Sequence, residues 1–219
     1  FLYLSEEPYI LDAGFNKRIF RNNNLLTFLK NNKLIEVKWV KNTGSYRKLL
    51  PLLKEKWNED CIIITIDDDT IYDNNLVKNL VDDYNKHNCV IGYRGFTPKL
   101  DKFENFDVNN RDKLKNLSSY NFLTGKGGIL YKPIFFHKTD NLIFDEGIYL
   151  KTCDKQDDIW FYILRVMNNV DCYVDGKKWI KMDLPNEGLF STFNSKNNNN
   201  TLAFKKTIKE LSKTSYKFL

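Results

Sequence analysis

The sequence lacks any long hydrophobic run, and this absence excludes a membrane-spanning helix, which needs about 18 apolar residues. The longest mostly apolar stretch, residues 61–66, has only the length of a strand. The chain opens with FLYLSEEPYI, which has neither the basic start nor the small-residue cleavage site of a signal peptide. It also has no initiator Met. We therefore expect no secretion signal in this chain, which can be a fragment of a longer protein.

Closely spaced cysteines and blocks of basic residues are absent as well. The four cysteines lie far apart and form no CxxC pair, which favours free thiols in a reducing compartment and hence a cytoplasmic protein. The 34 basic and 28 acidic residues give a net charge of +6, but no run of Lys and Arg is longer than two. Such interleaved charge indicates a solvated surface with local positive sites, so we expect no nucleic-acid partner.

The chain does contain enough apolar residues for a core, in alternating strand and helix patterns. Of its 219 residues, 42% are hydrophobic and 15% aromatic. Apolar periodicity predicts helices over 76–84 and 157–169. A third helix is expected over 45–57, where Pro51 interrupts it or marks its first turn. The short β-type runs are residues 1–5, 35–40, 61–66, 89–95, 127–131 and 171–176. This alternation predicts an α/β domain with a mainly parallel sheet covered by helices.

By composition, the chain divides into a domain, a linker and a tail. We expect the domain to span residues 1–193, with a polar, irregular stretch over 96–126 that is long enough to be a functional loop or insertion. The Asn-rich residues 194–200 predict a flexible linker. Residues 201–219 predict a basic amphipathic helix, for which packing on the domain is the favoured interpretation and peripheral association with a membrane is the alternative.

Three consecutive carboxylates, Asp67-Asp68-Asp69, follow the strongest predicted strand. In an open α/β sheet, ligands bind beyond the carboxyl ends of the strands. Two unit charges about 4 Å apart repel by roughly 4 kcal/mol at an effective dielectric constant of 20, so three on one turn need a cation or several donors. A Mg²⁺ or Mn²⁺ ion shared with phosphate oxygens fits this need. The alternative is a solvated acidic turn in which an Asp caps the helix that begins near Asp73.

A strand that ends in D-x-D occurs in two kinds of phosphate chemistry. In haloacid-dehalogenase-type phosphatases the pattern is D-x-D-x-T or V, and its first Asp, here Asp67, is a nucleophile. Ile71 stands at the fifth position and a long segment precedes the motif, and both points weigh against that interpretation. In GT-A glycosyltransferases, D-x-D holds a divalent metal that bridges the two phosphates of a nucleotide-sugar.

Two further stretches carry candidate functional residues. The segment LTGKGGILYKP, residues 123–133, places Gly125, Gly127 and Gly128 at the entry to a strand, where glycine lets the backbone approach a ligand; a plain tight turn is the alternative. Asp157-Asp158 stands at the start of an apolar helix. Carboxylates there can serve as caps, but a carboxylate beside aromatic residues can also gain basicity by desolvation and act as a general base.

In chain order, the segments SYRKLLPLL, IITIDDDTIYDNNLV, VIGYRG, TGKGGILYKP and QDDIWFY resemble bacterial-type and viral glycosyltransferases of the GT-A fold. These enzymes belong to the broad inverting superfamily that builds capsules, lipopolysaccharide and other surface glycans. A lone D-x-D is weak evidence of kinship, whereas D-x-D, GG-x-L-Y and D-D-I-W in this order are fairly specific. The resemblance implies a Rossmann-like sheet, a nucleoside-diphosphate sugar as donor, a hydroxyl of a glycan or other molecule as acceptor, and Mn²⁺ or Mg²⁺ as cofactor.

The resemblance also implies roles for the five aspartates. Asp67 and Asp68 would lie against the nucleotide ribose and diphosphate. Asp69 would be the direct metal ligand, with Asp67 as the second metal-site residue. Asp157, or else Asp158, would be the base that deprotonates the acceptor hydroxyl.

Four other residues take donor or acceptor roles by the same resemblance. Gly127 and Gly128 would line the nucleotide-sugar pocket where sugar and acceptor meet. Lys48 would contact donor phosphate, with an ordinary surface lysine as the alternative. Trp160 would stack on the acceptor sugar, although a core tryptophan is the favoured interpretation. Such enzymes usually begin with a further strand and helix that carry part of the nucleotide-base pocket, and this unit is missing from the chain or lies outside it.

These observations lead to one expected function and two rivals. We expect a metal-dependent, inverting glycosyltransferase that uses a nucleotide-sugar. The first rival is a phosphohydrolase with Asp67 as its nucleophile. The second is a non-enzymatic basic module that binds nucleic acid or anionic glycans, and its affinity would fall steeply with salt.

Overall fold

The computed structural model describes residues 1–20, 22–99, 106–107, 110–176, 180–183 and 198–216. Its helices are η1 (Asn16–Arg18), α1 (Asn23–Asn31), η2 (Gly44–Lys48), α2 (Leu50–Glu55), α3 (Leu76–His87), η4 (Gly125–Gly127), η5 (Pro133–Phe144), α4 (Glu146–Thr152), α5 (Asp157–Met167) and α6 (Asn199–Leu211). Its strands are β1 (Leu2–Leu4), β2 (Val37–Trp39), β3 (Ile63–Thr65), β4 (Thr70–Tyr72), β5 (Val90–Gly92), β6 (Gly95–Pro98), β7 (Arg111–Asp112), β8 (Phe122–Leu123), β9 (Ile129–Tyr131), β10 (Cys172–Val174) and β11 (Ile180–Asp183). None of the described helices is long and apolar enough to cross a membrane.

The central sheet has four strands in the order β10-β5-β9-β3. Strands β10 and β5 pair in parallel, whereas β9 runs antiparallel to both β5 and β3. The carboxyl ends of β3, β5 and β10 therefore lie together along one edge of the sheet, the edge that runs across the strands, and β9 begins there. The chain is an α/β protein as predicted, but the prediction of a mainly parallel sheet is wrong. The sheet is mixed because the η4 turn leads into β9 at the edge where β5 ends.

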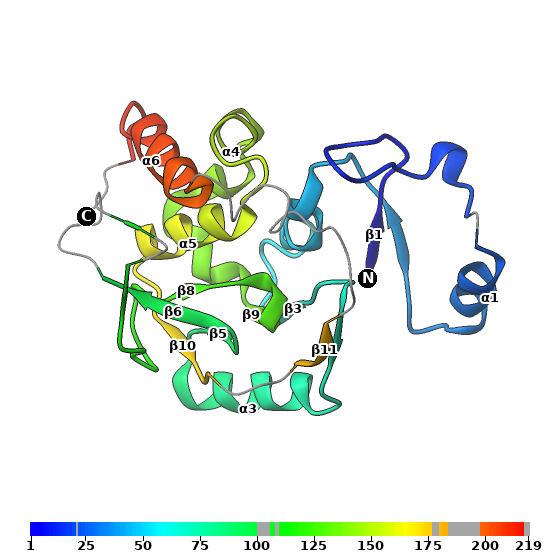
Figure 1. Ribbon diagram of the computed structural model, residues 1–219, viewed down its shortest axis with the longest axis horizontal. Helices are drawn as coiled ribbons and strands as arrows, with labels where there is room; N and C mark the ends of the chain where they lie inside the picture. Colours follow the sequence, from blue (N-terminus) through cyan, green and yellow to red (C-terminus); the bar gives the residue numbers. More distant parts are fainter. Residues whose placement is uncertain (21, 100–105, 108–109, 177–179, 184–197, 217–219) are drawn as a thin grey trace.

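Helices cover both faces of the central sheet (Figure 1). Val90 and Ile129 face the large core on the side of α5, whereas Ile91 and Leu130 face a smaller apolar cluster on the side of α3. This alternation follows from the two-residue period of a strand, in which successive side chains point to opposite faces. Helix α3 packs on β5 and β9, and α5 packs against η5 and β8. The central sheet is thus held between a layer that contains α5 and a layer formed by α3.

The six predicted strands all form, and so do the predicted helices over 76–84 and 157–169. The predicted helix over 45–57 is divided into η2 and α2. The backbone breaks at Leu49 (φ −121°, ψ −52°), and Pro51 then lies in the first turn of α2, where its missing N–H costs no helical hydrogen bond.

The stretch over 96–126, predicted to be irregular, contains a three-stranded antiparallel sheet in the order β7-β6-β8. Phe96 and Phe122 of this sheet stack with ring centroids 5.1 Å apart and belong to the large core. Asn121 is fully buried beside them and accepts a hydrogen bond from the Thr97 hydroxyl at 2.8 Å. This stretch is therefore, in its described part, an integral layer of the domain.

The predicted C-terminal helix forms as α6 and packs on the domain. It begins at Asn199, inside the segment predicted as a linker, while residues 194–197 lie outside the described residues. Phe204 of this helix is fully buried and stacks on Phe106 with ring centroids 4.4 Å apart. The helix also contacts α4 and α5. Its apolar face is thus part of the large core.

Residues 1–39 form a unit beside the central sheet, called here the N-terminal unit (Figure 1). Strands β1 and β2 pair in parallel, and η1 and α1 lie in the connection between them. Its own apolar cluster is small and consists of Phe15, Phe20 and Trp39. Arg47 of η2 joins it to the rest of the molecule, because its guanidinium donates a 2.7 Å hydrogen bond to Ser5 Oγ. The remaining elements are called the body.

Candidate active site

The acidic turn and the η4 turn meet at the edge of the central sheet where β3 ends. Strand β3 ends at Thr65 and leads into Asp67, and β9 follows Gly125. Because β3 and β9 are antiparallel neighbours, the end of one lies beside the start of the other. The first turn of α5 reaches the same edge, where Asp158 contacts η4. Segments far apart in the sequence thus converge at the place where open α/β sheets bind ligands.

Lys48 lies at the centre of this site. Its Nζ is 2.9 Å from Asp67 Oδ1 and 3.2 Å from Asp157 Oδ2. Burial opposes the charge on Lys48, but the neighbouring carboxylates, led by Asp157 and Asp67, outweigh burial and raise the pKa of Lys48 well above its ordinary value. The side chain is therefore an ammonium ion that links the acidic turn to α5. Lys48, Asp67, Asp157 and Asp158 are called the Lys48 cluster.

Asp157 is the most buried carboxylate of the cluster, with only 9% of its side chain exposed. Ser45 Oγ donates a 2.8 Å hydrogen bond to its Oδ1. Its Oδ2 is buried and, among the described residues, has no hydrogen-bond partner. The 3.2 Å contact with Lys48 is thus an ion pair without good hydrogen-bond geometry, and its attraction is mainly electrostatic.

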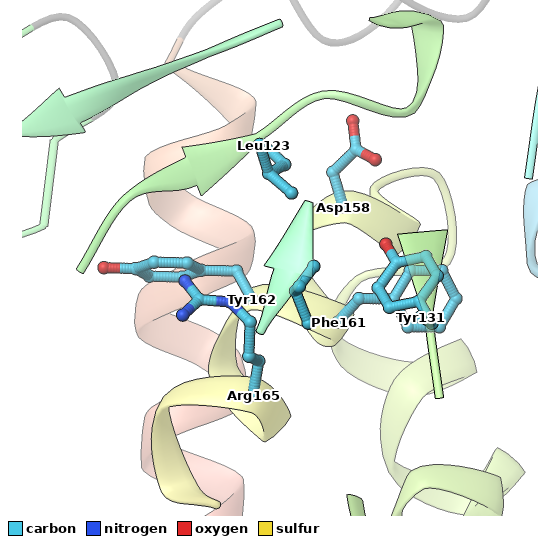
Figure 2. Close-up of a pocket in the computed structure, with 7 residues that line it drawn as sticks. Leu123, Tyr131, Asp158, Phe161, Tyr162 and Arg165 are labelled. Carbon is cyan, nitrogen blue, oxygen red and sulfur yellow. The ribbon is translucent and has the colours of Figure 1, made fainter. Parts of the chain in front are cut away.

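Asp158 is the carboxyl group whose pKa departs most clearly from its usual value. Its Oδ1 accepts a 3.0 Å hydrogen bond from the Gly125 N–H. Burial raises its pKa from 3.8 to about 7, the negative charge of Asp157 adds to this rise, and Lys48 opposes it. Figure 2 shows its carboxylate pointing away from the aromatic side chains beneath it. Asp158 therefore changes its charge near neutral pH.

The floor below Asp158 explains the desolvation of this carboxyl group. A small cavity there is otherwise lined by Val90, Leu123, Tyr131, Phe161, Tyr162 and Arg165 (Figure 2). Tyr131 and Arg165 are only 4% and 3% exposed. The Arg165 guanidinium donates to three backbone carbonyls, those of Ser119, Asn121 and Val170. Because these lining side chains are already packed and hydrogen-bonded, little water is available to solvate a charge on Asp158, and the neutral form of its carboxyl group is favoured.

Gly125 is the residue of the η4 turn that faces the cluster. A Cβ added to it would lie 2.7 Å from Lys48 Nζ, 3.3 Å from Asp158 Oδ1 and 3.6 Å from Asp67 Oδ1. Three charged or titratable side chains therefore point to one small space that only glycine leaves open. The sequence singled out the next two glycines as pocket residues, and their position is different.

Gly127 and Gly128 are placed against neighbouring chain segments. A Cβ on Gly127 would lie 2.5 Å from the Cβ of Arg94 and 2.6 Å from its backbone nitrogen. Gly128 has φ +79°, and a Cβ there would meet Leu76 of α3 at 3.2 Å. These two glycines allow the η4 turn to pack closely, and they support the site from behind rather than face the cluster.

The three aspartates of the acidic turn have different surroundings. Asp67 belongs to the Lys48 cluster, and its N–H donates a 2.9 Å hydrogen bond to the Tyr72 hydroxyl. That hydroxyl in turn donates to a carbonyl of the η4 turn at 3.1 Å, so the two turns are tied together. Asp68 is exposed at the surface. Asp69 accepts a 3.1 Å hydrogen bond from the Thr70 hydroxyl.

The donor groups at this edge suit a hard divalent cation. Mg²⁺ and Mn²⁺ prefer oxygen ligands, and three carboxyl groups surround a single ammonium ion here. In the described part of the chain, no group of three or more His, Cys, Asp or Glu side chains is arranged around a common metal position. The predicted metal ligands Asp67 and Asp69 both follow β3 at this edge, and Lys48 Nζ contacts Asp67.

Trp160 does not lie at the site. It is fully buried, its indole N–H donates a 2.9 Å hydrogen bond to the Ile143 carbonyl, and its ring packs near Tyr149. A ring with no exposed face cannot stack on a sugar, so the prediction of an acceptor-binding role is wrong. The favoured interpretation as a core tryptophan agrees with the structure.

Two residues of the site were missed by the sequence analysis. Ser45 precedes Lys48 by three residues on η2, and side chains three apart lie on one side of a 3₁₀ turn, so this spacing was an available signal. Tyr72 follows the acidic turn on β4. Its role in joining the two turns depends on tertiary contacts and had no local signal.

No protein-family model and no curated protein matches the chain. The site combines a carboxyl group whose pKa lies near 7, a protonated lysine and a carboxylate-rich turn, all at the edge where open α/β sheets bind ligands. This combination is compatible with chemistry on a phosphorylated substrate.

Proposed function

We propose that the protein is a GT-A-type glycosyltransferase that moves a sugar from a nucleoside-diphosphate sugar to a hydroxyl of a glycan or other acceptor, with inversion. The observation that carries this proposal is Asp158, the member of the Lys48 cluster whose carboxyl group has a pKa of about 7 and accepts a hydrogen bond from the Gly125 N–H. A base whose pKa lies near the operating pH is suited to take a proton from a hydroxyl group in the transition state. The order of motifs along the chain supports the same conclusion.

Of the two candidate bases, Asp158 suits the role better than Asp157. Asp157 is engaged by the Ser45 hydroxyl on one oxygen and by the Lys48 ammonium on the other. Asp158 is partly exposed, and the described residues provide a hydrogen bond to only one of its oxygens, from Gly125. That bond orients the carboxylate and leaves the second oxygen for an acceptor hydroxyl. The base role in this proposal is thus given to Asp158.

The charged groups of the site have complementary tasks in this proposal. A bound divalent metal supplies positive charge that stabilises the departing diphosphate. Asp67 and Asp69 would hold it, since their carboxylates follow β3 at the ligand-binding edge. The net charge of +6 favours the approach of an anionic donor.

The test is a transfer assay with a panel of nucleotide-sugars and Mn²⁺, in which released nucleoside diphosphate and glycosylated acceptor are both measured. We expect Asp158→Asn to lower the turnover number by about 10² to 10⁴, the usual contribution of a general base. Donor binding, followed by calorimetry, should be retained. The matched control is Asp171→Asn, which removes an exposed carboxylate just before β10, at the opposite edge of the sheet.

Three outcomes would contradict the proposal. In the first, Asp158→Asn transfers sugar at the rate of the unmodified protein. In the second, the protein hydrolyses phosphomonoesters, is trapped by beryllofluoride, and loses both properties in Asp67→Asn, which would identify a phosphohydrolase instead. Salt-dependent binding to nucleic acid without any turnover would favour the non-enzymatic rival.

A further inference from the structure

Lys48 holds a position where carboxylates from two elements stabilise a positive charge. Its Nζ lies between carboxylates from two separate elements, Asp67 after β3 and Asp157 at the start of α5. It also borders the small space at Gly125, where a Cβ would be 2.7 Å away. This ammonium therefore bridges the acidic turn and the start of α5.

The Asp157 carboxylate is a second, independent observation that this position suits a cation with a greater need for ligands than an ammonium ion. Its side chain is nine-tenths buried, and its Oδ2 faces Lys48 without a hydrogen bond among the described residues. A buried carboxylate oxygen is normally hydrogen-bonded or bound to a cation, because its desolvation is costly. The electrostatic contact with Lys48 only partly meets that need.

We propose that Lys48 is an internal counter-ion that occupies the cation position while the donor is absent, and that it moves from Asp67 to the donor diphosphate when metal and donor bind. This inference rests on the proposed function, because it concerns the metal and the nucleoside diphosphate of that reaction. Its consequence is cooperative binding: divalent metal alone binds weakly, and nucleoside diphosphate strengthens its binding.

The physical basis is competition for the same carboxylates. A divalent cation near Asp67 repels the ammonium of Lys48, so metal can bind well only if Lys48 leaves. The flexible four-carbon stem of lysine allows this movement, and phosphate oxygens offer the ammonium a new anionic partner. Asp157 and its hydrogen bond from Ser45 would keep the lysine close to the site during the exchange.

The test measures Mn²⁺ affinity by electron paramagnetic resonance, first with the protein alone and then with added UDP or GDP. In the unmodified protein, we expect a nucleoside diphosphate to increase Mn²⁺ affinity by about tenfold or more. In Lys48→Met, we expect affinity for Mn²⁺ alone to rise by a similar factor, with a smaller further gain from the nucleotide than in the unmodified protein. Lys138→Met, which removes an exposed lysine on η5, controls for net charge and should change neither value.

Lys48→Met leaves Asp157 without its counter-ion, so it can fail to fold. The pair Asp157→Asn and Lys48→Met/Asp157→Asn avoids this problem, because neither contains an uncompensated buried charge at position 157. The double variant should bind Mn²⁺ alone about tenfold more tightly than Asp157→Asn does.

Equal or weaker Mn²⁺ binding on removal of Lys48, or no Mn²⁺ binding by any variant, would overturn the inference. No sugar or acceptor is present in these measurements, so they are independent of the transfer assay. Sugar transfer without the Lys48 effect would contradict this inference alone, and the Lys48 effect without transfer would contradict the proposed function alone.

Discussion

The body and the N-terminal unit differ sharply in how much of each helix they bury. In α5 of the body, all residues except Asp158 and Met167 are buried. In α1 of the N-terminal unit, no residue is buried, although its apolar residues are arranged on one face. Six of the fourteen exposed large apolar side chains among the described residues lie in the first 34 positions. Amphipathic pattern alone therefore does not ensure a packed helix.

This difference in burial shows which part of the molecule holds the site residues rigidly. Asp157 and Asp158 come from the first turn of α5, whose aromatic and aliphatic residues fix it in the core. Lys48 and Ser45 come from η2, directly after the N-terminal unit, but neighbouring Tyr46 is fully buried and hydrogen-bonds to Cys153 of the body. The site is thus built on the body, and we expect its geometry to survive local opening of the N-terminal unit.

The largest expected contrast comes from truncating one aromatic residue in each region. Trp160→Ala should lower the free energy of unfolding by about 4 kcal/mol, because it leaves a large cavity in the core. Phe28→Ala, in α1, should change it by less than about 0.5 kcal/mol, since Phe28 is 53% exposed. Urea denaturation followed by fluorescence and circular dichroism measures both. Similar losses in the two variants would show that α1 is as well packed as α5.

A second contrast separates the two glycines of η4. Gly127→Ala should destabilise the protein by about 2 kcal/mol, because the new Cβ meets the backbone of Arg94. Gly125→Ala should cost less than about 1 kcal/mol, since the Cβ meets the mobile end of Lys48, yet it should weaken binding of nucleoside diphosphate by displacing that end. Thermal unfolding and calorimetry test the pair. A reversed order of stabilities would refute the packing assigned to η4.

The third contrast depends on pH and concerns Asp158. Its folded pKa of about 7 exceeds the ordinary value of 3.8, so the folded state holds the proton more tightly than the unfolded state. Wild-type stability should therefore fall, relative to Asp158→Asn, as pH rises from about 4 to about 7. At pH 8 the variant should be more stable by about 1–2 kcal/mol, and at pH 4 the two should be equal. A constant difference between the two proteins across this pH range would refute the shift.

The smallest contrast tests whether the N-terminal unit opens by itself. Asn22 caps α1 by accepting hydrogen bonds from the N–H groups of Asn24 and Leu25 at 2.9 and 3.2 Å. Asn22→Ala should destabilise this helix by about 1 kcal/mol and speed hydrogen exchange of its amides severalfold. The midpoint of global unfolding should stay unchanged. A matching shift of that midpoint would mean that the unit unfolds together with the body.

The sequence predicted the elements of the fold better than their pairing. Strand runs such as 61–66 and 127–131 were found because apolar, β-branched residues stand between turn residues. The antiparallel direction of β9 could not be read locally, since it depends on how the η4 turn enters the sheet. The three-stranded sheet within 96–126 was missed because its strands are short and polar residues separate them.

The residues that form the candidate site could be predicted from the sequence, but the contacts between them could be predicted less well. Asp67, Asp157, Asp158 and Lys48 were all identified from the sequence, and the structure brings these four together. Their division of labour was not predictable, because one of two adjacent carboxylates is paired with Lys48 and the other faces Gly125 only in the folded state. Both a core and an acceptor-binding position were open for Trp160, because an aromatic residue one turn beyond a carboxylate can lie in either; the favoured core position is the one observed.

The most direct test of the central claim is the pKa of the Asp158 carboxyl group. It can be measured by carbon-13 NMR titration of aspartate-labelled protein, with the resonance assigned by its loss in Asp158→Asn. The account predicts a pKa of about 7, because burial and Asp157 outweigh Lys48. A pKa near 4 would show that the group is an ordinary solvated carboxylate, and the proposed base of the transfer reaction would then be wrong.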